Sequence, residues 1–481
     1  MADTPPRLSL LDVTACERPV TLRLPFRFGV VTLREAPQLF VRVRIKLQDG
    51  REGDGISAEL LVPKWFDKAP ELTNEDNFDQ LRRSLASAAR HMKAAGQHTA
   101  FGLTAAANGV HRAACENAGL NGLVASFGQA LVERAIIDAL GRLENAPASA
   151  LVRANRLGID TRLTPDLAGF DLDGFLSLRE PAVSINVRHT VGLLDALTRD
   201  ATKGQRLDDG LPESLEEVIA AYGHRYFKLK VAGKIDADLE RLAGIAAVLD
   251  RQSAPYHVTL DGNEQYEEVG AVIELWRRIG EDKRLARLKA SILLLEQPIA
   301  RSRALSEPIR PLGDEVPVEV DESDADFDVF PRARALGYRG ISAKSCKGFY
   351  RALLNAARVA KLNDEMANSR NGARCFMSAE DLTTQGGIAV QQDLMLATLV
   401  GATHVERNGH HYVDGMAGAP TPEQDAFLAA HGDLYRRAPN GRARLDIRDG
   451  MVSLGSIARA AGLASAVIPD FTAMRESAIA T

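Results

Sequence analysis

From about residue 183 onward, the sequence alternates between short apolar segments and amphipathic helical patterns. Strands that alternate with helices in this way form a parallel sheet. Eight such units fit into about 230 residues, which favours a closed barrel over an open, doubly wound sheet. The segments expected to form the strands are SINVRHTVGLL, YFKLKV, YHVTLD, ILLLEQ, VPVEVD, GISAKS, RCFMSA and THVERN. We therefore predict an α/β fold with a (β/α)8-type barrel, a modified TIM barrel, at residues 183–414.

The residues on either side of this repeat have different patterns. Within 39–47, apolar residues alternate with Arg and Lys, as in a half-buried antiparallel strand. Residues 75–145 have a helical pattern, and 129–143 place their apolar side chains on one stripe. Residues 1–182 are therefore predicted to form an α+β domain with linker helices. Residues 415–481 contain more strand-like sequence and are predicted to pack back on that domain.

Composition excludes several classes of protein. The chain has 481 residues and a formal charge of −5, so it has no electrostatic footprint for nucleic acid or an anionic membrane. No apolar run approaches the length of about 18 residues that a membrane span needs. The four cysteines are scattered without a CxxC pair, which fits a reducing compartment. Because the N-terminal residues also lack a signal pattern, we expect a cytoplasmic protein without nucleic-acid or membrane partners.

Two lysines, Lys228 and Lys230, lie in the apolar segment YFKLKV. Side chains two positions apart on a strand point to the same face, so both ammonium groups would face the barrel interior. Burying two like charges is costly unless something requires them there. A K-x-K tripeptide taken alone is usually solvated, so the pair gains meaning only from the residues around it.

Four charged residues, three of them acidic, occupy the strands that follow. Asp261, Glu296 and Asp321 end the third, fourth and fifth expected strands, and Lys344 lies within the sixth, GISAKS. Active sites of barrels lie at the carboxyl ends of the strands, so these side chains should meet. A set of carboxylates without His or Cys selects a hard cation, Mg²⁺ or Mn²⁺. Any single strand-terminal Asp would be interpreted as a turn or helix cap, but the joint order on successive strands is specific.

The lysines flank the acid cluster from opposite sides. Such a pair would move a proton on and off either face of the carbon next to a substrate carboxylate. A metal ion at the carboxylates would hold the charge of the enediolate that forms. The like charge of Lys228 would favour loss of the proton from Lys230.

This arrangement resembles the enolase superfamily, in its mandelate racemase and muconate-lactonizing-enzyme branch. The motifs that carry the resemblance are KLK at 228–230, Asp261-Gly-Asn263, Glu296-Gln-Pro298, Asp321-Glu-Ser323 and Lys344-Ser-Cys-Lys-Gly348. The helical pattern ERAIIDALGRL is similar to the family's linker helix, and LFVRVRIKLQDGREGDGISAE is similar to its capping domain. The resemblance therefore implies that residues 1–182 cap the barrel mouth, and that the protein assembles as a homo-oligomer, a dimer or octamer.

The resemblance also implies roles for individual residues. Asp261, Glu296 and Asp321 would bind Mg²⁺, with Mn²⁺ as a possible substitute, and Lys230 and Lys344 would be the acid and base. Lys228 would orient the substrate carboxylate. The residues implied to support the metal ligands or to face the substrate are Asn263, Glu322, Arg27, Phe28 and Glu380. Phe26 and Trp65, in the two expected capping loops, would exclude water.

The function that follows is Mg²⁺-dependent abstraction of the α-proton of a small carboxylate substrate, as in a racemase, an epimerase or a cycloisomerase. A syn-dehydratase of the o-succinylbenzoate synthase type, a Schiff-base aldolase and a non-catalytic relative are the alternatives. The region HVERNGHHYVDG lacks the Asp-x-Asp pair of dipeptide epimerases, which disfavours that substrate. His410-His-Tyr-Val-Asp414 is interpreted as a pocket wall or loop contact and not as a second metal site. Apparent insertions lie near 66–118, 145–182 and 201–212.

Overall fold

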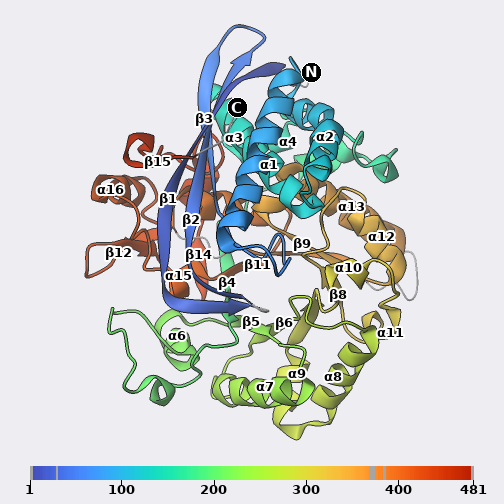
Figure 1. The fold of residues 1–481 in the computed structure, drawn as a ribbon, viewed down its shortest axis with the longest axis vertical. Helices are drawn as coiled ribbons and strands as arrows, with labels where there is room; N and C mark the ends of the chain where they lie inside the picture. Colours follow the sequence, from blue (N-terminus) through green and yellow to red (C-terminus); the bar gives the residue numbers. More distant parts are fainter. Residues whose placement is uncertain (1–3, 29–30, 368–373, 383–385, 478–481) are drawn as a thin grey trace.

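The N-terminal part of the chain forms a long antiparallel sheet that is covered by helices (Figure 1). The computed structural model describes residues 4–28, 31–367, 374–382 and 386–477. The sheet order is β15-β1-β2-β3. Its strands are β1 (Leu8–Phe28), β2 (Val31–Leu47), β3 (Glu52–Leu60) and β15 (Arg475–Glu476). On β2 the burial alternates through Val41, Val43 and Ile45, as the sequence pattern predicts.

Three long helices follow this sheet: α1 (Asn74–Ala94), α2 (Ala100–Asn117) and α3 (Gly122–Leu143). Almost all of α3 is buried, because the helix packs between the sheet and the rest of the chain. Gly128 allows its close approach to α1, since a Cβ there would lie 2.3 Å from the backbone of Ser84. The short elements that follow are α4 (Ala148–Arg153), η1 (Pro165–Leu167) and α5 (Leu172–Ser177).

All eight predicted barrel segments are strands of one parallel sheet. In spatial order the sheet reads β11-β4-β5-β6-β7-β8-β9-β10. The strands are β4 (Ser184–Val191), β5 (Tyr226–Lys230), β6 (His257–Asp261), β7 (Ile292–Glu296), β8 (Val318–Val320), β9 (Gly340–Ala343), β10 (Phe376–Ala379) and β11 (His404–Arg407). The sheet curls until its end strands β10 and β11 are neighbours. No backbone pairing joins these two strands within the described residues, so closure of the barrel stays a prediction.

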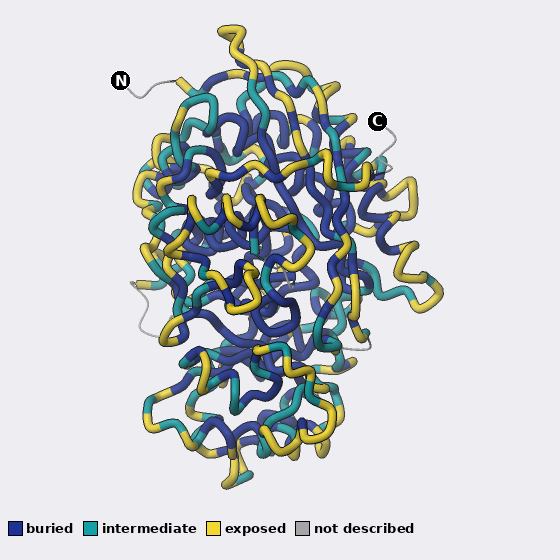
Figure 2. The backbone as a smooth tube through the Cα atoms, turned by 90° about the vertical axis from the view of Figure 1, so that its left-hand side faces the viewer, coloured by how far each residue is buried: buried dark blue, intermediate teal, exposed yellow. Residues whose placement is uncertain are grey.

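Helices alternate with these strands, as the repeat predicts. Figure 2 shows buried backbone concentrated inside the molecule and exposed backbone on its outer loops. The helices and helical turns of this region are α6 (Leu215–Tyr222), α7 (Ile235–Leu249), α8 (Val269–Glu281), α9 (Ala286–Ala290), α10 (Arg301–Ala304), α11 (Arg310–Gly313), α12 (Val329–Leu336), α13 (Phe349–Ala367), α14 (Ile388–Leu399) and α15 (Gly409–Tyr412), with η2 (Arg199–Thr202), η3 (Lys283–Leu285) and η4 (Ser345–Lys347). None of the helices in the described ranges is long and apolar enough to cross a membrane.

The C-terminal segment contacts both parts of the fold. Its strand β14 (Met451–Ser453) pairs antiparallel with β4, and β15 pairs antiparallel with β1. The remaining elements are α16 (Thr421–Ala430), β12 (Tyr435–Arg437), β13 (Ala443–Leu445), α17 (Gly455–Arg459) and η5 (Phe471–Ala473). The domain boundaries near 182 and 414 stay predictions, because the contacts of this segment join it to both neighbours.

Candidate active site

Charged side chains from five adjacent strands meet inside the curled sheet. The strand register places Lys230 level with Asp261, and Asp261 level with Glu296. Asp321 follows β8 directly, and Lys344 follows β9. All these side chains are buried, although charged groups are normally exposed. The predicted residues of strands two to six are therefore brought together at the carboxyl ends of their strands.

Lys228 is the centre of this cluster. Its Nζ lies 3.0 Å from Asp261, 2.7 Å from Glu296, 2.5 Å from Glu380 and 3.0 Å from Glu406. Burial alone would lower the pKa of Lys228, but the four surrounding carboxyl groups raise it well above its usual value. Lys228 is therefore an ammonium group that holds acids from four strands together.

Lys230 and Lys344 each pair with one acid. Lys230 Nζ donates to Asp261 Oδ2 at 2.5 Å, and Lys344 Nζ donates to Asp321 Oδ2 at 2.5 Å. Burial would lower the pKa of Lys344, but the charge of Asp321 outweighs this effect and the pKa is raised. The two lysines thus stand on different strands, each beside a different acid of the cluster.

A small cavity of about 30 Å³ opens between these lysines and the N-terminal region. The residues that line it are Phe26, Val62, Trp65, Lys228, Lys230, Asn263, Lys344, Asp381, Leu382, Glu406 and Asn408. The ring of Trp65 lies over Lys344, with Nζ 4.5 Å from its centroid. Segments near residues 26 and 62–65 therefore cover the lysines, as expected of capping loops.

The cluster carries an excess of negative charge. Its cations are Arg188, Lys228, Lys230, Lys344 and Lys347, whereas its acids are Asp261, Glu296, Glu319, Asp321, Glu322, Glu380 and Glu406. Burial and the neighbouring acids Asp261 and Glu380 raise the pKa of Glu296 well above its usual value. Burial likewise raises the pKa of Glu380 to about 7 and that of Glu319 to about 8. Burial and the neighbouring acids thus make loss of a proton less favourable for all three groups.

The donor set fits a hard divalent cation. Asp261, Glu296 and Asp321 supply only carboxylate oxygens, as Mg²⁺ prefers. Glu296 Oε2 is buried and makes no hydrogen bond, although Lys228 lies near it. A second acid group, formed by Glu296, Glu319 and Glu380, brings its oxygens within 4.8 Å of one another. Glu296 belongs both to the predicted ligand set and to this group, and among the acids of the described residues only this group brings its oxygens so close together.

Comparisons with solved structures identify the fold. A member of the enolase superfamily from Roseovarius nubinhibens matches with a TM-score of 0.57 and 18% identity, over 98% of this chain and 97% of that chain. The 2-chloromuconate cycloisomerase of Rhodococcus opacus matches with a TM-score of 0.56 and 16% identity, over 96% of this chain and 98% of that chain. The dipeptide epimerase of Enterococcus faecalis, complexed with Mg and L-Leu-L-Tyr, matches with a TM-score of 0.57 and 15% identity, over 95% of this chain and 99% of that chain. The chain has the fold of the enolase superfamily. No family model and no curated protein matches its sequence.

The predicted supporting residues lie directly behind the acids of the cluster. The backbone N–H of Asn263 donates to Asp261 Oδ1 at 2.8 Å, and its side chain donates to Glu322 Oε1 at 3.1 Å. Asn263, Glu264 and Gln297 have φ values of 41°, 68° and 32°, in the left-handed region that non-glycine residues seldom adopt. Such backbone strain is concentrated at functional sites, and here it follows two of the candidate metal ligands.

An arginine ties the covering loop to this same strained turn. Arg301 pairs with Glu264 at 2.7 Å and donates to the carbonyl oxygens of Trp65 and Phe66 at 2.8 and 2.9 Å. Lys68 also pairs with Glu264. The position of Trp65 over Lys344 is therefore fixed by contacts to the loop behind the acid cluster.

Three predicted substrate-facing residues have different outcomes. Glu380 does not line the cavity, because it lies deeper and pairs with Arg188 and Lys228. Arg27 is exposed and is also absent from the cavity wall. The side chain of Phe28 lies outside the described residues. Phe26 does line the cavity, where its ring packs on Tyr412.

Sequence reasoning missed four charged residues of the cluster. Arg188, Glu319 and Glu406 lie inside apolar strand segments, and Lys347 follows Lys344 by three positions. Lys347 donates to Asp321 Oδ1 at 3.1 Å, and Ser378 donates to Glu319 at 2.9 Å. The signal was present, since a charged residue that alternates with apolar ones on a buried parallel strand must face a polar interior.

Proposed function

We propose that the protein is an Mg²⁺-dependent enzyme that removes the α-proton of a small carboxylate substrate. The observation that carries the proposal is the pair Lys230 and Lys344. They come from β5 and from the end of β9, on either side of the acid cluster, and both reach the same cavity. The solved structures that share this fold include a cycloisomerase and a dipeptide epimerase, which supports chemistry next to a carboxylate.

In the proposed reaction Lys230, as a neutral amine, takes the proton from the α-carbon and becomes an ammonium group. The electron pair of the broken C–H bond moves into the carboxylate and forms an enediolate. Lys344, as an ammonium group, returns a proton to the opposite face and becomes neutral, which inverts the carbon. Exchange of protons with water then restores both lysines. Positive charge aimed at the developing oxyanion is the largest contribution expected of such a site.

Asp261, Glu296 and Asp321 are the residues proposed to hold Mg²⁺. A bound ion would stabilise the negative charge that develops on the substrate oxygens. The alternative set, Glu296, Glu319 and Glu380, is less suitable for catalysis. Asp261 and Asp321 pair with Lys230 and Lys344, which line the cavity, whereas Glu319 accepts from Ser378 and Glu380 pairs with Arg188. Trp65 and Phe26 exclude water from the cavity, which strengthens the electrostatic interactions inside it.

Hydrogen exchange tests the proposal. The purified protein is incubated with Mg²⁺ in D₂O with a library of acyl-amino acids and related carboxylic acids, and deuterium at the α-carbon is measured by NMR. We expect exchange with at least one class of substrate and its loss in Lys230→Ala. Lys46→Ala is the matched control, because Lys46 is exposed on the N-terminal sheet and should not affect exchange. Absence of exchange across the library, or full activity in Lys230→Ala, would refute the proposal.

Metal binding is tested separately through the melting temperature, since an ion that binds the folded state raises it. We expect Mg²⁺ to stabilise the wild type and Glu319→Gln, and to lose this effect in Asp321→Asn. Loss in Glu319→Gln with retention in Asp321→Asn would instead place the ion at the deeper acid set.

One observation favours a second candidate reaction. Because Asp321 raises the pKa of Lys344, this lysine is held as an ammonium group, suited to stabilising charge. A cycloisomerase or a syn-dehydratase needs one basic lysine and one such cation, whereas a racemase needs both lysines to exchange roles. Deuterium exchange that depends on Lys230 for one enantiomer of the substrate only would support this second candidate.

A further inference from the structure

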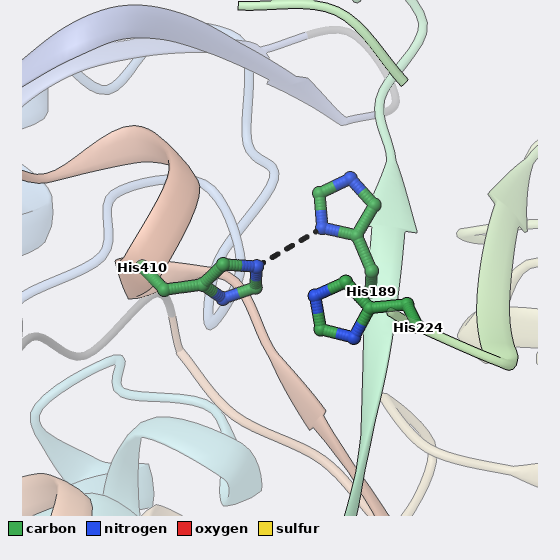
Figure 3. Close-up of side chains that lie close together, drawn as sticks. All are labelled: His189, His224 and His410. Atoms are coloured by element: carbon green, nitrogen blue, oxygen red, sulfur yellow. Dashed lines mark hydrogen bonds between the residues drawn. The ribbon is translucent and has the colours of Figure 1, made fainter. Parts of the chain in front are cut away.

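A cluster of buried histidines lies on the other side of the curled parallel sheet from the acid cluster. His189 stands on β4 between Arg188 and Thr190, which reach the interior acids Glu380 and Glu406. Successive side chains of a strand point to opposite faces, so His189 points away from that interior. His224 from the turn before β5 and His410 from α15 lie next to it (Figure 3). The chain thus brings three histidines from distant segments to one point.

The geometry of these rings suits coordination of one ion. One ring nitrogen from each of the three histidines lies within 4.8 Å of the others. His189 Nδ1 and His410 Nε2 are 3.3 Å apart and share a hydrogen bond, so a metal ion would displace the proton between them. Ligand atoms of a tetrahedral zinc site, with Zn–N bonds of about 2.0–2.1 Å, are separated by about 3.3 Å. The observed spacing is therefore that of two ligands on a shared metal ion.

The hydrogen bond of His224 leaves one of its lone pairs free for a ligand. His224 Nδ1 lies 3.2 Å from the carbonyl oxygen of Val187, to which it must donate. This contact fixes the proton on Nδ1 and leaves Nε2 as an unprotonated nitrogen, which has no partner although it is buried. Metal-binding histidines characteristically have their second nitrogen held by such a carbonyl. In Figure 3 the ring of His224 faces that of His410.

The surroundings keep the rings uncharged. His189, His224 and His410 are all buried, and burial lowers the pKa of each, that of His224 to about 4. Neutral imidazole is the form that binds a metal ion. No carboxylate belongs to the group, so its chemistry differs from that of the Mg²⁺ site.

We propose that His189, His224 and His410 bind one Zn²⁺ ion on the outer side of β4. Three imidazoles suit zinc and leave a fourth position for water or another ligand. The site would tie β4, the turn before β5 and α15 together, at the point where β11 returns to β4.

The sequence motif His410-His-Tyr-Val-Asp414 contributes only His410 to this cluster. Asp414 of His410-His-Tyr-Val-Asp414 does not face the cluster, because it pairs with Arg442 and Arg444. The expectation that this segment is a pocket wall holds for His410, which adjoins a small cavity lined by Tyr222 and Arg444. The site proposed here depends instead on two histidines that lie far upstream in the sequence.

The test uses full-length protein without a histidine tag, in excess Mg²⁺. Zinc content is measured by mass spectrometry, and Co²⁺ is titrated into metal-free protein to record the intense visible absorption of tetrahedral cobalt. We expect one ion per chain in the wild type and in Asp321→Asn, which removes a ligand of the proposed Mg²⁺ site. We expect loss of the ion in His224→Gln and His410→Gln.

His111→Gln is the matched control. His111 is a buried histidine outside the cluster, and both of its ring nitrogens already have partners in Ser87 and Ala125. It should retain the ion even though the substitution affects packing. If the His224 and His410 variants do not fold, the visible spectrum of Co²⁺ bound to the wild type tests the proposal. A wild type without the tetrahedral spectrum, or full binding in His410→Gln, would overturn the proposal, whatever the outcome for α-proton exchange.

Discussion

Replacing Lys228 by methionine tests whether this lysine holds the acid cluster together. Its ammonium group lies within 3.0 Å of four carboxyl groups that come from four different strands. Methionine keeps much of the length of the side chain and removes the charge. Removing one partner of a buried ion pair costs about 3–5 kcal/mol, because the remaining charge has lost its compensation. We expect the free energy of unfolding of the metal-free protein to decrease by at least this amount.

The loss can be converted into a melting temperature. An unfolding entropy of about 2.1 cal/mol/K per residue gives roughly 1 kcal/mol/K for 481 residues. The expected decrease is therefore about 3–5 °C in buffer with a metal chelator. Lys46→Met is the control, since Lys46 makes an exposed pair with Glu52 and should shift the melting temperature by about 1 °C or less.

The decrease should depend on pH with a defined sign. Burial would raise the pKa of Glu406, but Lys228 holds it well below its usual value. A carboxyl group with a lowered pKa in the folded state contributes stability above its unfolded pKa of about 4.5, and loses it as the pH falls. Lys228→Met removes this contribution, so its deficit should be nearly as large at pH 4.5 as at pH 8, and should shrink only as the pH falls further, toward the lowered pKa of Glu406. A variant that melts like Lys46→Met at pH 8, or a deficit that has already disappeared at pH 4.5, would refute the reasoning.

Two further predictions concern stability away from the acid cluster. Gly128→Ala should lower the free energy of unfolding by about 1–3 kcal/mol, because its Cβ would lie 2.3 Å from the backbone of Ser84. Gly109→Ala, also in a helix but with open space around it, should raise it by up to about 1 kcal/mol; urea unfolding distinguishes the two. Glu133→Gln should match the wild type near pH 4.5 and be more stable by about 3 kcal/mol above pH 7, as followed by thermal melts. Burial raises the pKa of Glu133 to about 7, so the stability of its protonated form is lost as the pH rises through that value. Equal pH profiles for the two proteins would contradict this assignment.

The eight strands could be predicted because their apolar runs are short, regular and separated by helical patterns. Their acidic residues could be placed because they end those runs, and parallel strands end at a common edge. This reasoning needs only local sequence and one topological rule. It explains why Asp261, Glu296 and Asp321 meet in the structure in the order in which the chain presents them.

Other features depend on how the sheet curls, which local sequence does not specify. Glu380 was expected to face the substrate, but the curl of the sheet brings Arg188 from β4 against it and draws it into the interior. The histidine site is set by the same curl, because β11 must return to β4 before His410 can meet His189. The position of the covering loop also depends on residues far apart in the sequence. The side chain of Arg301 donates to the backbone carbonyl oxygen of Trp65, and no pattern of side chains in the sequence predicts this contact.

The two lysines of β5 have separate tasks that follow from their depth in the sheet. Lys228 is 1% exposed and Lys230 is 6% exposed, and both point inward because they are two positions apart on one strand. The deeper lysine contacts four acids and carries one charge, so it cannot neutralise them all. Burial, together with the charge of neighbouring acids, raises the pKa values of Glu296, Glu319 and Glu380. The outer lysine contacts Asp261 alone among these acids and lines the cavity, where a substrate proton would be within its reach. The strand can therefore bury both lysines. The inner one, Lys228, pairs with the acids, and these acids in turn are the proposed partners of Lys230 and of a divalent cation.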